Sequence, residues 1–291
     1  MKDLVSIVIP TYNRPKKLKR AVNSVLQQSY NNFEVLVVND SSAEQQVIDV
    51  ISELNDTRLK YFRNLRTKGA NGARNTGILN SKGNFVAFLD DDDEWLQNKL
   101  ETQMSCIKSK QKDYAGVYSA YQIEKKNKLK EYRGNKEGNL LNEIILDDVK
   151  ICTGSNLMVK SEVFEKVGLW DEELLRQQDL EFLIRFLMEY KLAYDDHIVT
   201  KIYGHNTPNP KKAFDQREKY LKKISKYLKF LSKNEKDQFY SDHYRRQTMY
   251  LMSMRKFKLA NENWRESKTY IMFSLRKDLK ISLLYLKNYL A

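Results

Sequence analysis

The stretch GNFVAFLDDDDEW, residues 83–95, joins an unbroken apolar run to four consecutive aspartates, Asp90 to Asp93. Short apolar runs rich in Val and Phe are typical of strands that are buried on both faces of a parallel sheet. The aspartates would then follow the carboxyl end of a strand, which is where open α/β sheets bind their ligands. This stretch therefore predicts a polar site at one edge of a parallel sheet.

The preceding residues repeat the same alternation of apolar runs and amphipathic segments. The runs are VSIVIP (5–10), FEVLVVND (33–40) and RLKYFRN (58–64), and helical spacing follows in KKLKRAVNSVLQQ (16–28), AEQQVIDVISEL (43–54) and ANGARNTGILNS (70–81). After the aspartates, EWLQNKLETQMSCI (94–107) continues it. This alternation predicts a doubly wound α/β fold with a mostly parallel sheet flanked by helices.

The pattern of apolar and polar residues changes near residue 210. Residues 113–210 contain the strand-like runs GVYSAYQI (116–123) and SNLMV (155–159) and a helix that begins near Gln178. After Pro208 and Pro210 only helical spacing remains, carried by Tyr220, Leu221, Ile224, Tyr227, Leu228 and Leu231. We expect an α/β domain over residues 1–210 and a smaller all-helical domain over residues 211–291.

All the excess charge of the chain lies in the helical region. The net charge is +13, and residues 211–291 hold 21 Lys and Arg against 8 Asp and Glu, so the remainder is balanced. Basic helices with an apolar face can lie on an anionic membrane surface. The alternative is a packed helical domain whose lysines are only solvated. A nucleic-acid-binding protein is a rival on charge alone, but no motif of such a protein occurs.

The sequence shows neither a membrane-spanning or signal segment nor paired cysteine motifs, which bears on the expected compartment and on the role of the cysteines. It contains no uninterrupted apolar segment of about eighteen residues, and Pro10, Asn13 and Arg14 come too early for a signal peptide. We therefore expect a cytoplasmic protein, with a peripheral position on the inner membrane surface as the alternative for its tail. Cys106 and Cys152 lack CxxC spacing and are interpreted as packing residues.

The four aspartates need compensation for their charge. Carboxylates at this spacing repel one another, and a hard divalent cation such as Mg²⁺ or Mn²⁺ takes their oxygens while leaving positions open for phosphate. A solvated acidic loop ahead of a helix is the alternative. The run alone does not decide between them.

Four blocks of sequence together resemble a known family. SIVIPTYNR (6–14), VLVVND (35–40), GANGARNTGILNSKGNFVAFLDDDDEW (69–95) and GLWDEELLRQQDLEFLIR (168–185) are similar, in this order, to family 2 of the inverting nucleotide-sugar glycosyltransferases, which have a GT-A fold. The resemblance covers residues 4–205. It implies a metal-dependent enzyme that transfers a hexose from a UDP-sugar to a hydroxyl of a glycan acceptor, lipid-linked or protein-linked. Surface polysaccharide or glycoprotein assembly would be its setting, and UDP-galactose or UDP-glucose its favoured donor.

The resemblance also implies roles for particular residues. Asp179 would be the base that takes the proton from the acceptor hydroxyl, and Mn²⁺ or Mg²⁺ would be held by Asp92 and His205. Asp93 would hold the neighbouring carboxylates in position without itself being a ligand of the metal. The residues implied to bind the nucleotide-sugar are Pro10, Thr11, Tyr12, Arg14, Asp40, Arg74, Asp90 and Asp91.

This chain departs from the family pattern at two positions, and alternatives stay open. It has Asn39 before Asp40 where the family more often has Asp, and Gln178 before Asp179 where Glu is usual. Arg74 would otherwise pair with the acidic run to hold the fold, Asp179 would be an ordinary residue of a first helical turn, and His205 a solvated loop residue. A nucleotidyltransferase is the alternative enzyme, although it does not account for the block around Asp179.

Overall fold

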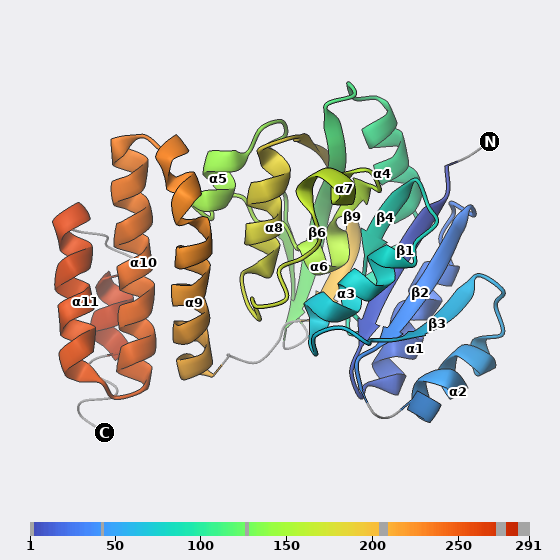
Figure 1. Cartoon of the computed structure of the whole chain (residues 1–291), viewed down its shortest axis with the longest axis horizontal. Helices are drawn as coiled ribbons and strands as arrows, with labels where there is room; N and C mark the ends of the chain where they lie inside the picture. Colours follow the sequence, from blue (N-terminus) through green and yellow to red (C-terminus); the bar gives the residue numbers. More distant parts are fainter. Residues whose placement is uncertain (1–2, 42–43, 126–127, 204–208, 272–277, 285–291) are drawn as a thin grey trace. The chain divides into compact units, whose positions relative to one another are not determined.

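The computed structural model describes residues 3–41, 44–125, 128–203, 209–271 and 278–284 (Figure 1). Its internal contacts divide the chain into two compact units. The α/β unit comprises Met1–Leu141 and Val149–His205, and the helical unit comprises Asn142–Asp148 and Asn206–Ala291. The segment Asn142–Asp148, which lies before the predicted boundary at residue 210, is part of the helical unit. Within that unit Asn142 donates to Glu235 (3.1 Å) and Asp147 pairs with Arg246 (2.8 Å).

The described residues of the α/β unit form one mixed sheet in the order β3-β2-β1-β4-β8-β6-β9-β5, with β7 beside β6. The first four strands pair in parallel, as predicted, and antiparallel pairs join β4 to β8, β8 to β6 and β5 to β9. The strands are β1 Val5–Thr11, β2 Phe33–Asn39, β3 Leu59–Arg63, β4 Phe85–Phe88, β5 Glu94–Trp95, β6 Tyr114–Lys125, β7 Lys128–Tyr132, β8 Met158–Lys160 and β9 Lys191–Tyr203.

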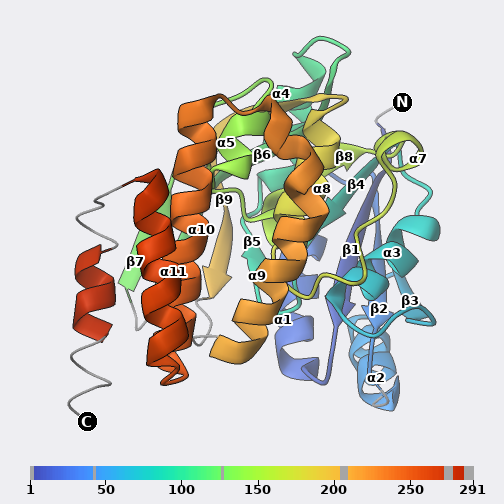
Figure 2. The same cartoon turned by 60° about the vertical axis from the view of Figure 1, so that its left-hand side comes forward.

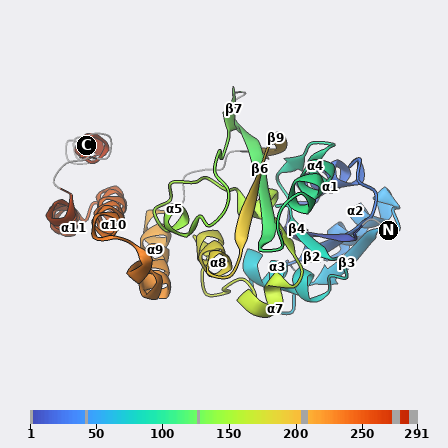
Figure 3. The ribbon, with the colours of Figure 1, turned by 90° about the horizontal axis from the view of Figure 1, so that it is seen from above.

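Helices cover both faces of this sheet, so the predicted doubly wound α/β architecture is confirmed. Seen from above, α1, α2 and α4 lie on one side and α3, α7 and α8 on the other (Figure 3). The helices of this unit are α1 Pro15–Leu26, α2 Glu44–Leu54, α3 Ala70–Leu79, α4 Lys99–Lys108, α6 Thr153–Asn156, α7 Val163–Val167 and α8 Gln178–Leu187, with α5 Leu141–Ile145 at the division between the units.

Successive side chains of β1 point to opposite faces of the sheet, so this strand contacts the helices on both sides. All seven residues of β1 are buried, and Ile7 and Ile9 pack in the core that α1, α2 and α4 share. Val8 faces the other side, where a Cβ on Gly77 of α3 would lie 2.3 Å from its Cγ1. Only glycine at position 77 lets α3 approach the sheet this closely.

Aromatic side chains fill the layer beneath α7 and α8. Trp170 stacks on Phe182 with ring centroids 4.8 Å apart, and its ring meets Phe88 of β4 edge-on at 5.4 Å. Phe164 of α7 stacks on Phe182 at 5.9 Å. The start of α8 is therefore fixed against the strand that precedes the acidic run.

The helical unit contains α9 Pro210–Ile224, the 3₁₀ segment η1 Ser225–Phe230, α10 Lys233–Ser253 and α11 Phe257–Tyr270, and α10 packs against both α9 and α11 (Figure 2). Ser232 and Glu235 form a capping box at the start of α10. Arg245, fully buried, pairs with Asp278 at 2.9 Å. Its hydrogen bonds to the Asp278 carboxylate and the Ile271 carbonyl satisfy a charge that would otherwise be costly to bury.

The apolar residues that recur at helical spacing after Pro210 divide between two segments of this unit, because α9 ends at Ile224 and the next turn is 3₁₀. Tyr220, Ile224, Leu228 and Leu231 are nevertheless buried. Among the described residues, no helix has both the length and the apolar character needed to cross a membrane.

Candidate active site

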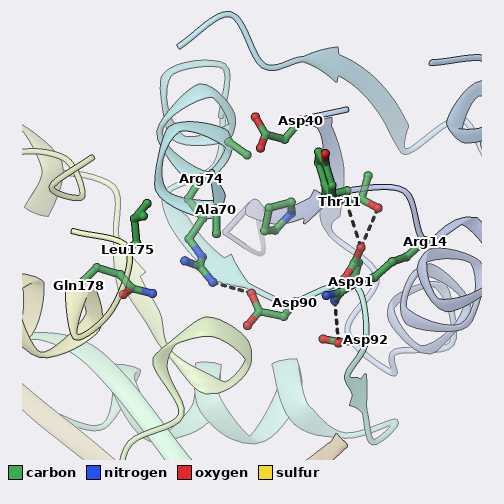
Figure 4. A pocket seen from close by; sticks show the side chains of 13 residues that line it. Thr11, Arg14, Asp40, Ala70, Arg74, Asp90, Asp91, Asp92, Leu175 and Gln178 are labelled. Carbon is green, nitrogen blue, oxygen red and sulfur yellow. Dashed lines mark hydrogen bonds and ion pairs between the residues drawn. The ribbon is translucent and has the colours of Figure 1, made fainter. Parts of the chain in front are cut away.

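A pocket of about 460 Å³ opens where β1, β2 and β4 end (Figure 4). Parallel pairing explains the convergence, because it brings the carboxyl ends of these strands to one edge. The lining residues are Pro10, Thr11, Tyr12, Arg14, Asp40, Ala70, Ala73, Arg74, Asp90, Asp91, Asp92, Leu175 and Gln178. All eight residues assigned from sequence to nucleotide-sugar binding lie on this pocket. Their roles there stay a prediction.

We call the side formed by Pro10, Thr11, Tyr12 and Arg14 the β1 end of the pocket. Asp91 and Asp92 are buried there, and both bond to the same guanidinium: Arg14 Nη1 lies 3.1 Å from Asp91 Oδ1 and 2.7 Å from Asp92 Oδ2. Thr11 Oγ1 donates to Asp91 Oδ2 at 2.8 Å. Burial still raises the pKa of Asp91, against the opposing effects of Thr11 and Arg14.

Asp90 points away from this cluster and pairs with α3. Its Oδ1 lies 2.5 Å from Nη2 of the buried Arg74, and its backbone N–H donates to Ser155 Oγ at 3.1 Å. A Cβ on Gly154 of α6 would lie 2.5 Å from Asp90 Oδ2 and 3.0 Å from Arg74 Nη2. The absence of a side chain at position 154 therefore leaves the room that this ion pair occupies.

Asp93 turns into the protein instead of into the pocket. Its Oδ2 accepts from Ser155 Oγ at 2.5 Å, and its Oδ1 accepts from the backbone N–H of Tyr203 at 3.1 Å. Burial, followed by the charge of Asp90, raises its pKa to about 7. Asp93 thus ties the end of β4 to α6 and β9.

We call the opposite side of the pocket, formed by Leu175 and Gln178, the α8 end. Asp179 lies next to it in the first turn of α8, half-buried, and Gln177 enters that helix with a left-handed φ of 58°. Asp179 itself is not among the lining residues, and it interacts with Arg74 and Thr153. Burial raises its pKa, whereas the helix N-terminus alone would favour the ionised form. Desolvation therefore outweighs the helix dipole, and Asp179 is a stronger base than its position in the helix indicates.

Residues that sequence reasoning missed hold the α8 end in place. Asn71 Nδ2 donates to the carbonyls of Asp171 and Leu174 at 2.7 and 2.8 Å. The side-chain amide of Asn75 bonds to the backbone of Trp170 twice: its Nδ2 donates to the Trp170 carbonyl, and its Oδ1 accepts from the Trp170 N–H. Asn71 and Asn75 lie within the quoted GANGARN block, one helical turn apart, which is the only signal that would have indicated a shared face.

The predicted metal ligands are placed only in part. Asp92 lies on the pocket, where Lys17 Nζ approaches its Oδ2 at 3.5 Å beside Arg14, and His205 lies outside the described residues. Within the described part of the chain, no three His, Cys, Asp or Glu side chains gather closely enough to hold a metal ion. Cys106 and Cys152 are free thiols, and burial raises the pKa of both.

Known proteins similar in sequence to this chain are glycosyltransferases. The model of the family described as glycosyl transferase family 2 matches residues 6–168. An uncharacterized glycosyltransferase of Rickettsia typhi is 30% identical over 254 residues, which cover 82% of this chain and 78% of that protein. The Escherichia coli protein WfgD, named as a UDP-Glc:alpha-D-GlcNAc-diphosphoundecaprenol beta-1,3-glucosyltransferase, is 40% identical over 126 residues, covering 43% of this chain and 49% of that one.

The fold has a solved counterpart. Staphylococcus aureus TarS 1–349 in complex with UDP-GlcNAc superposes with a TM-score of 0.64 at 16% identity, covering 92% of this chain and 91% of that one. At this identity the likeness concerns the fold alone, and it extends over both the α/β and the helical parts of the sequence.

Proposed function

The chain belongs to glycosyl transferase family 2 and is a glycosyltransferase, and from that premise we propose that it transfers a hexose from a UDP-sugar, with inversion, to a hydroxyl of a glycan acceptor. The observation that carries this proposal is the pocket at the strand ends, with carboxylates and Arg14 at one end and Asp179 beside the other. Glucose and galactose are the hexoses that the family resemblance favours, and WfgD, which is named for a UDP-Glc donor, supports glucose.

The proposed chemistry divides between the two ends of the pocket. Asp40 would accept hydrogen bonds from the base, and Arg74 would bond to phosphate or ribose oxygens. Asp179 would take the proton from the acceptor hydroxyl as that oxygen attacks the anomeric carbon from the face opposite the leaving diphosphate. Arg74 lies close enough to favour the ionised form of Asp179, which a proton acceptor requires.

We also infer a divalent cation, Mn²⁺ or Mg²⁺, as the enzyme's cofactor. Asp90 and Asp92 offer carboxylate oxygens to the same pocket, and the Asp90 side chain is 34% exposed. Carboxylate oxygens are the donors that a hard cation prefers, so Asp90 and Asp92 are the residues that would hold it. Asp92 would have to exchange its bonds to Arg14 and Lys17 for the cation. When bound, the metal would neutralise charge on the departing diphosphate.

The acceptor is proposed to be lipid-linked and reached at the cytoplasmic membrane surface. WfgD is named for a diphosphoundecaprenol acceptor, and the excess charge of this chain lies in residues 211–291. Each basic group near an anionic surface contributes about 1 kcal/mol. Cosedimentation with vesicles containing anionic lipid should therefore be strong at low salt and weak at high salt. Equal sedimentation with neutral vesicles would contradict this position.

The transfer itself is tested with purified protein, Mn²⁺, a panel of UDP-hexoses and GlcNAc-diphospholipid, by following UDP release. The product linkage should have the anomeric configuration opposite to that of the donor. A product that retains the donor configuration by NMR would overturn the single displacement. Failure of every UDP-sugar to bind would overturn the proposed donor class.

A further inference from the structure

The side-chain oxygen of Gln178, at the α8 end of the pocket, lacks a hydrogen-bond partner among the described residues. This oxygen, Oε1, is buried and accepts no hydrogen bond from any residue in the described ranges. Gln178 lines both the main pocket and a narrower recess of about 40 Å³ beside it, between Leu175 and the start of α3. Figure 4 shows its amide on the same side of the pocket as Arg74, across from Asp40 and Thr11.

Neither Arg74 nor Asn71 donates to this oxygen in the described structure. Arg74 uses Nη2 for Asp90 and Nη1 for Asn71 Oδ1 (3.3 Å), and the Asn71 amide donates to two backbone carbonyls. Arg74 Nε is also buried without a hydrogen bond in the described structure. A buried acceptor and a buried donor therefore both lack a partner among the described residues here, and leaving such groups unpaired is unfavourable.

A sugar matches this pair of groups in its chemistry, because each hydroxyl both donates and accepts. A cavity that holds one water needs about 10–15 Å³, so the recess beside Gln178 admits a hydroxyl or hydroxymethyl substituent but not a further ring. Asp179, the proposed base, is the next residue along α8. A group held by Gln178 therefore lies at the end of the pocket where the transferred sugar must meet the acceptor.

We propose that Gln178 is a specificity-determining residue, whose Oε1 accepts a hydrogen bond from one hydroxyl of the sugar being transferred. This inference rests on the proposed function, since it assumes a UDP-hexose in the pocket. A donor that lacks this hydroxyl leaves the amide unpaired in the complex and is selected against. Glutamine here, in place of a carboxylate, gives this selection without adding a fifth negative charge to a pocket that already contains Asp40, Asp90, Asp91 and Asp92.

The test compares wild type with Gln178→Met, which keeps the length of the side chain and removes the acceptor. Both are assayed for kcat/KM with the best UDP-hexose of the panel and with each of its monodeoxy analogues. With wild type, one analogue should lose about tenfold, the size of a neutral hydrogen bond. With Gln178→Met, the parent donor should lose about as much, and that analogue should lose nothing more. UDP affinity should be unchanged.

Gln177→Asn is the matched control, because Gln177 precedes the helix, does not line the pocket, and has a left-handed φ that Asn tolerates. It should discriminate among the analogues as wild type does. If Gln178→Met discriminates equally well, or loses the same factor with every analogue, the inference is overturned while the transferase assignment stands. Absence of UDP binding and of transfer by wild type would instead overturn the proposed function.

Discussion

The two ends of the pocket differ in how their polar groups are satisfied. At the β1 end, Asp91 and Asp92 share the Arg14 guanidinium, and Thr11 adds a hydrogen bond to Asp91. At the α8 end, Gln178 Oε1 is buried without a bond in the described structure, and burial raises the pKa of Asp179. Charged groups that already have partners keep the pocket rigid. Buried polar groups that lack a hydrogen-bond partner can instead bond to a ligand. This difference is the basis of our proposal that the α8 end selects the donor and carries out the reaction.

Asp179→Asn breaks the α8 end most severely. It preserves size and removes the proton acceptor, and loss of a general base typically lowers kcat about a hundredfold to ten-thousandfold. Steady-state UDP release should show this loss, while calorimetry shows unchanged UDP affinity. Near-normal turnover by a folded Asp179→Asn protein would refute the assignment.

The control for that substitution must avoid Glu181. Although Glu181 is the nearest carboxylate in sequence, Arg185 holds both of its oxygens at 2.7 and 2.8 Å and also bonds to the carbonyls of Val167 and Leu169. Glu181→Gln would therefore disturb the packing of α8. Glu173→Gln, at an exposed position before the helix, is a better control and should keep full turnover.

Asp92→Ala breaks the β1 end. It removes a proposed cation ligand and leaves Arg14 and Lys17 without one of their carboxylates. Charge-assisted interactions are worth about 1.5–3 kcal/mol, so UDP affinity in Mn²⁺ should fall about tenfold to a hundredfold. Calorimetry should give a similar loss for wild type in EDTA. If wild type binds UDP equally well in EDTA, the metal proposal fails.

Gly154→Ala perturbs the Asp90–Arg74 ion pair, which lies between the two ends of the pocket. The added methyl group would lie 2.5 Å from Asp90 Oδ2, so the Asp90–Arg74 pair must shift. Overpacking of this kind costs about 1–3 kcal/mol. We expect kcat/KM to fall about tenfold with little change in UDP affinity. Thermal unfolding should be measured alongside, because an equal loss of UDP binding and folding stability would indicate general damage instead.

The pH dependence of kcat/KM gives the smallest expected effect and concerns the α8 end alone. Asp179 acts as a base only when ionised, and burial raises its pKa above the ordinary value of 3.8. The acid limb of the kcat/KM profile, which reports the free enzyme, should therefore lie at higher pH than for an exposed aspartate. Because the folded protein holds this proton more tightly than the unfolded chain, Asp179 should also lower folding stability as pH rises through the same range. An acid limb at or below 3.8 would contradict the burial.

Local patterns in the sequence were sufficient for the fold. Period-two and period-3.6 spacing depend only on neighbouring residues, so the four parallel strands and their helices were predicted before the structure, and the quoted blocks indicated the family. The same strand ends predicted that Thr11, Asp40 and Asp90 would converge, because parallel strands end at one edge. Whether these residues bind a nucleotide-sugar stays a prediction.

The tertiary structure decided what each side chain meets. Four adjacent aspartates look equivalent in sequence, yet Asp91 and Asp92 bond to Arg14, Asp90 pairs with Arg74, and Asp93 turns inward to Ser155. These partners come from 16 to 78 residues away along the chain. The placement of Asn142–Asp148 in the helical unit depends on such long-range contacts too, and only the folded chain shows that Gln178 Oε1 has no partner among the described residues. Sequence spacing determines which face a residue lies on, but hydrogen bonds and burial require the distances that only the folded chain supplies.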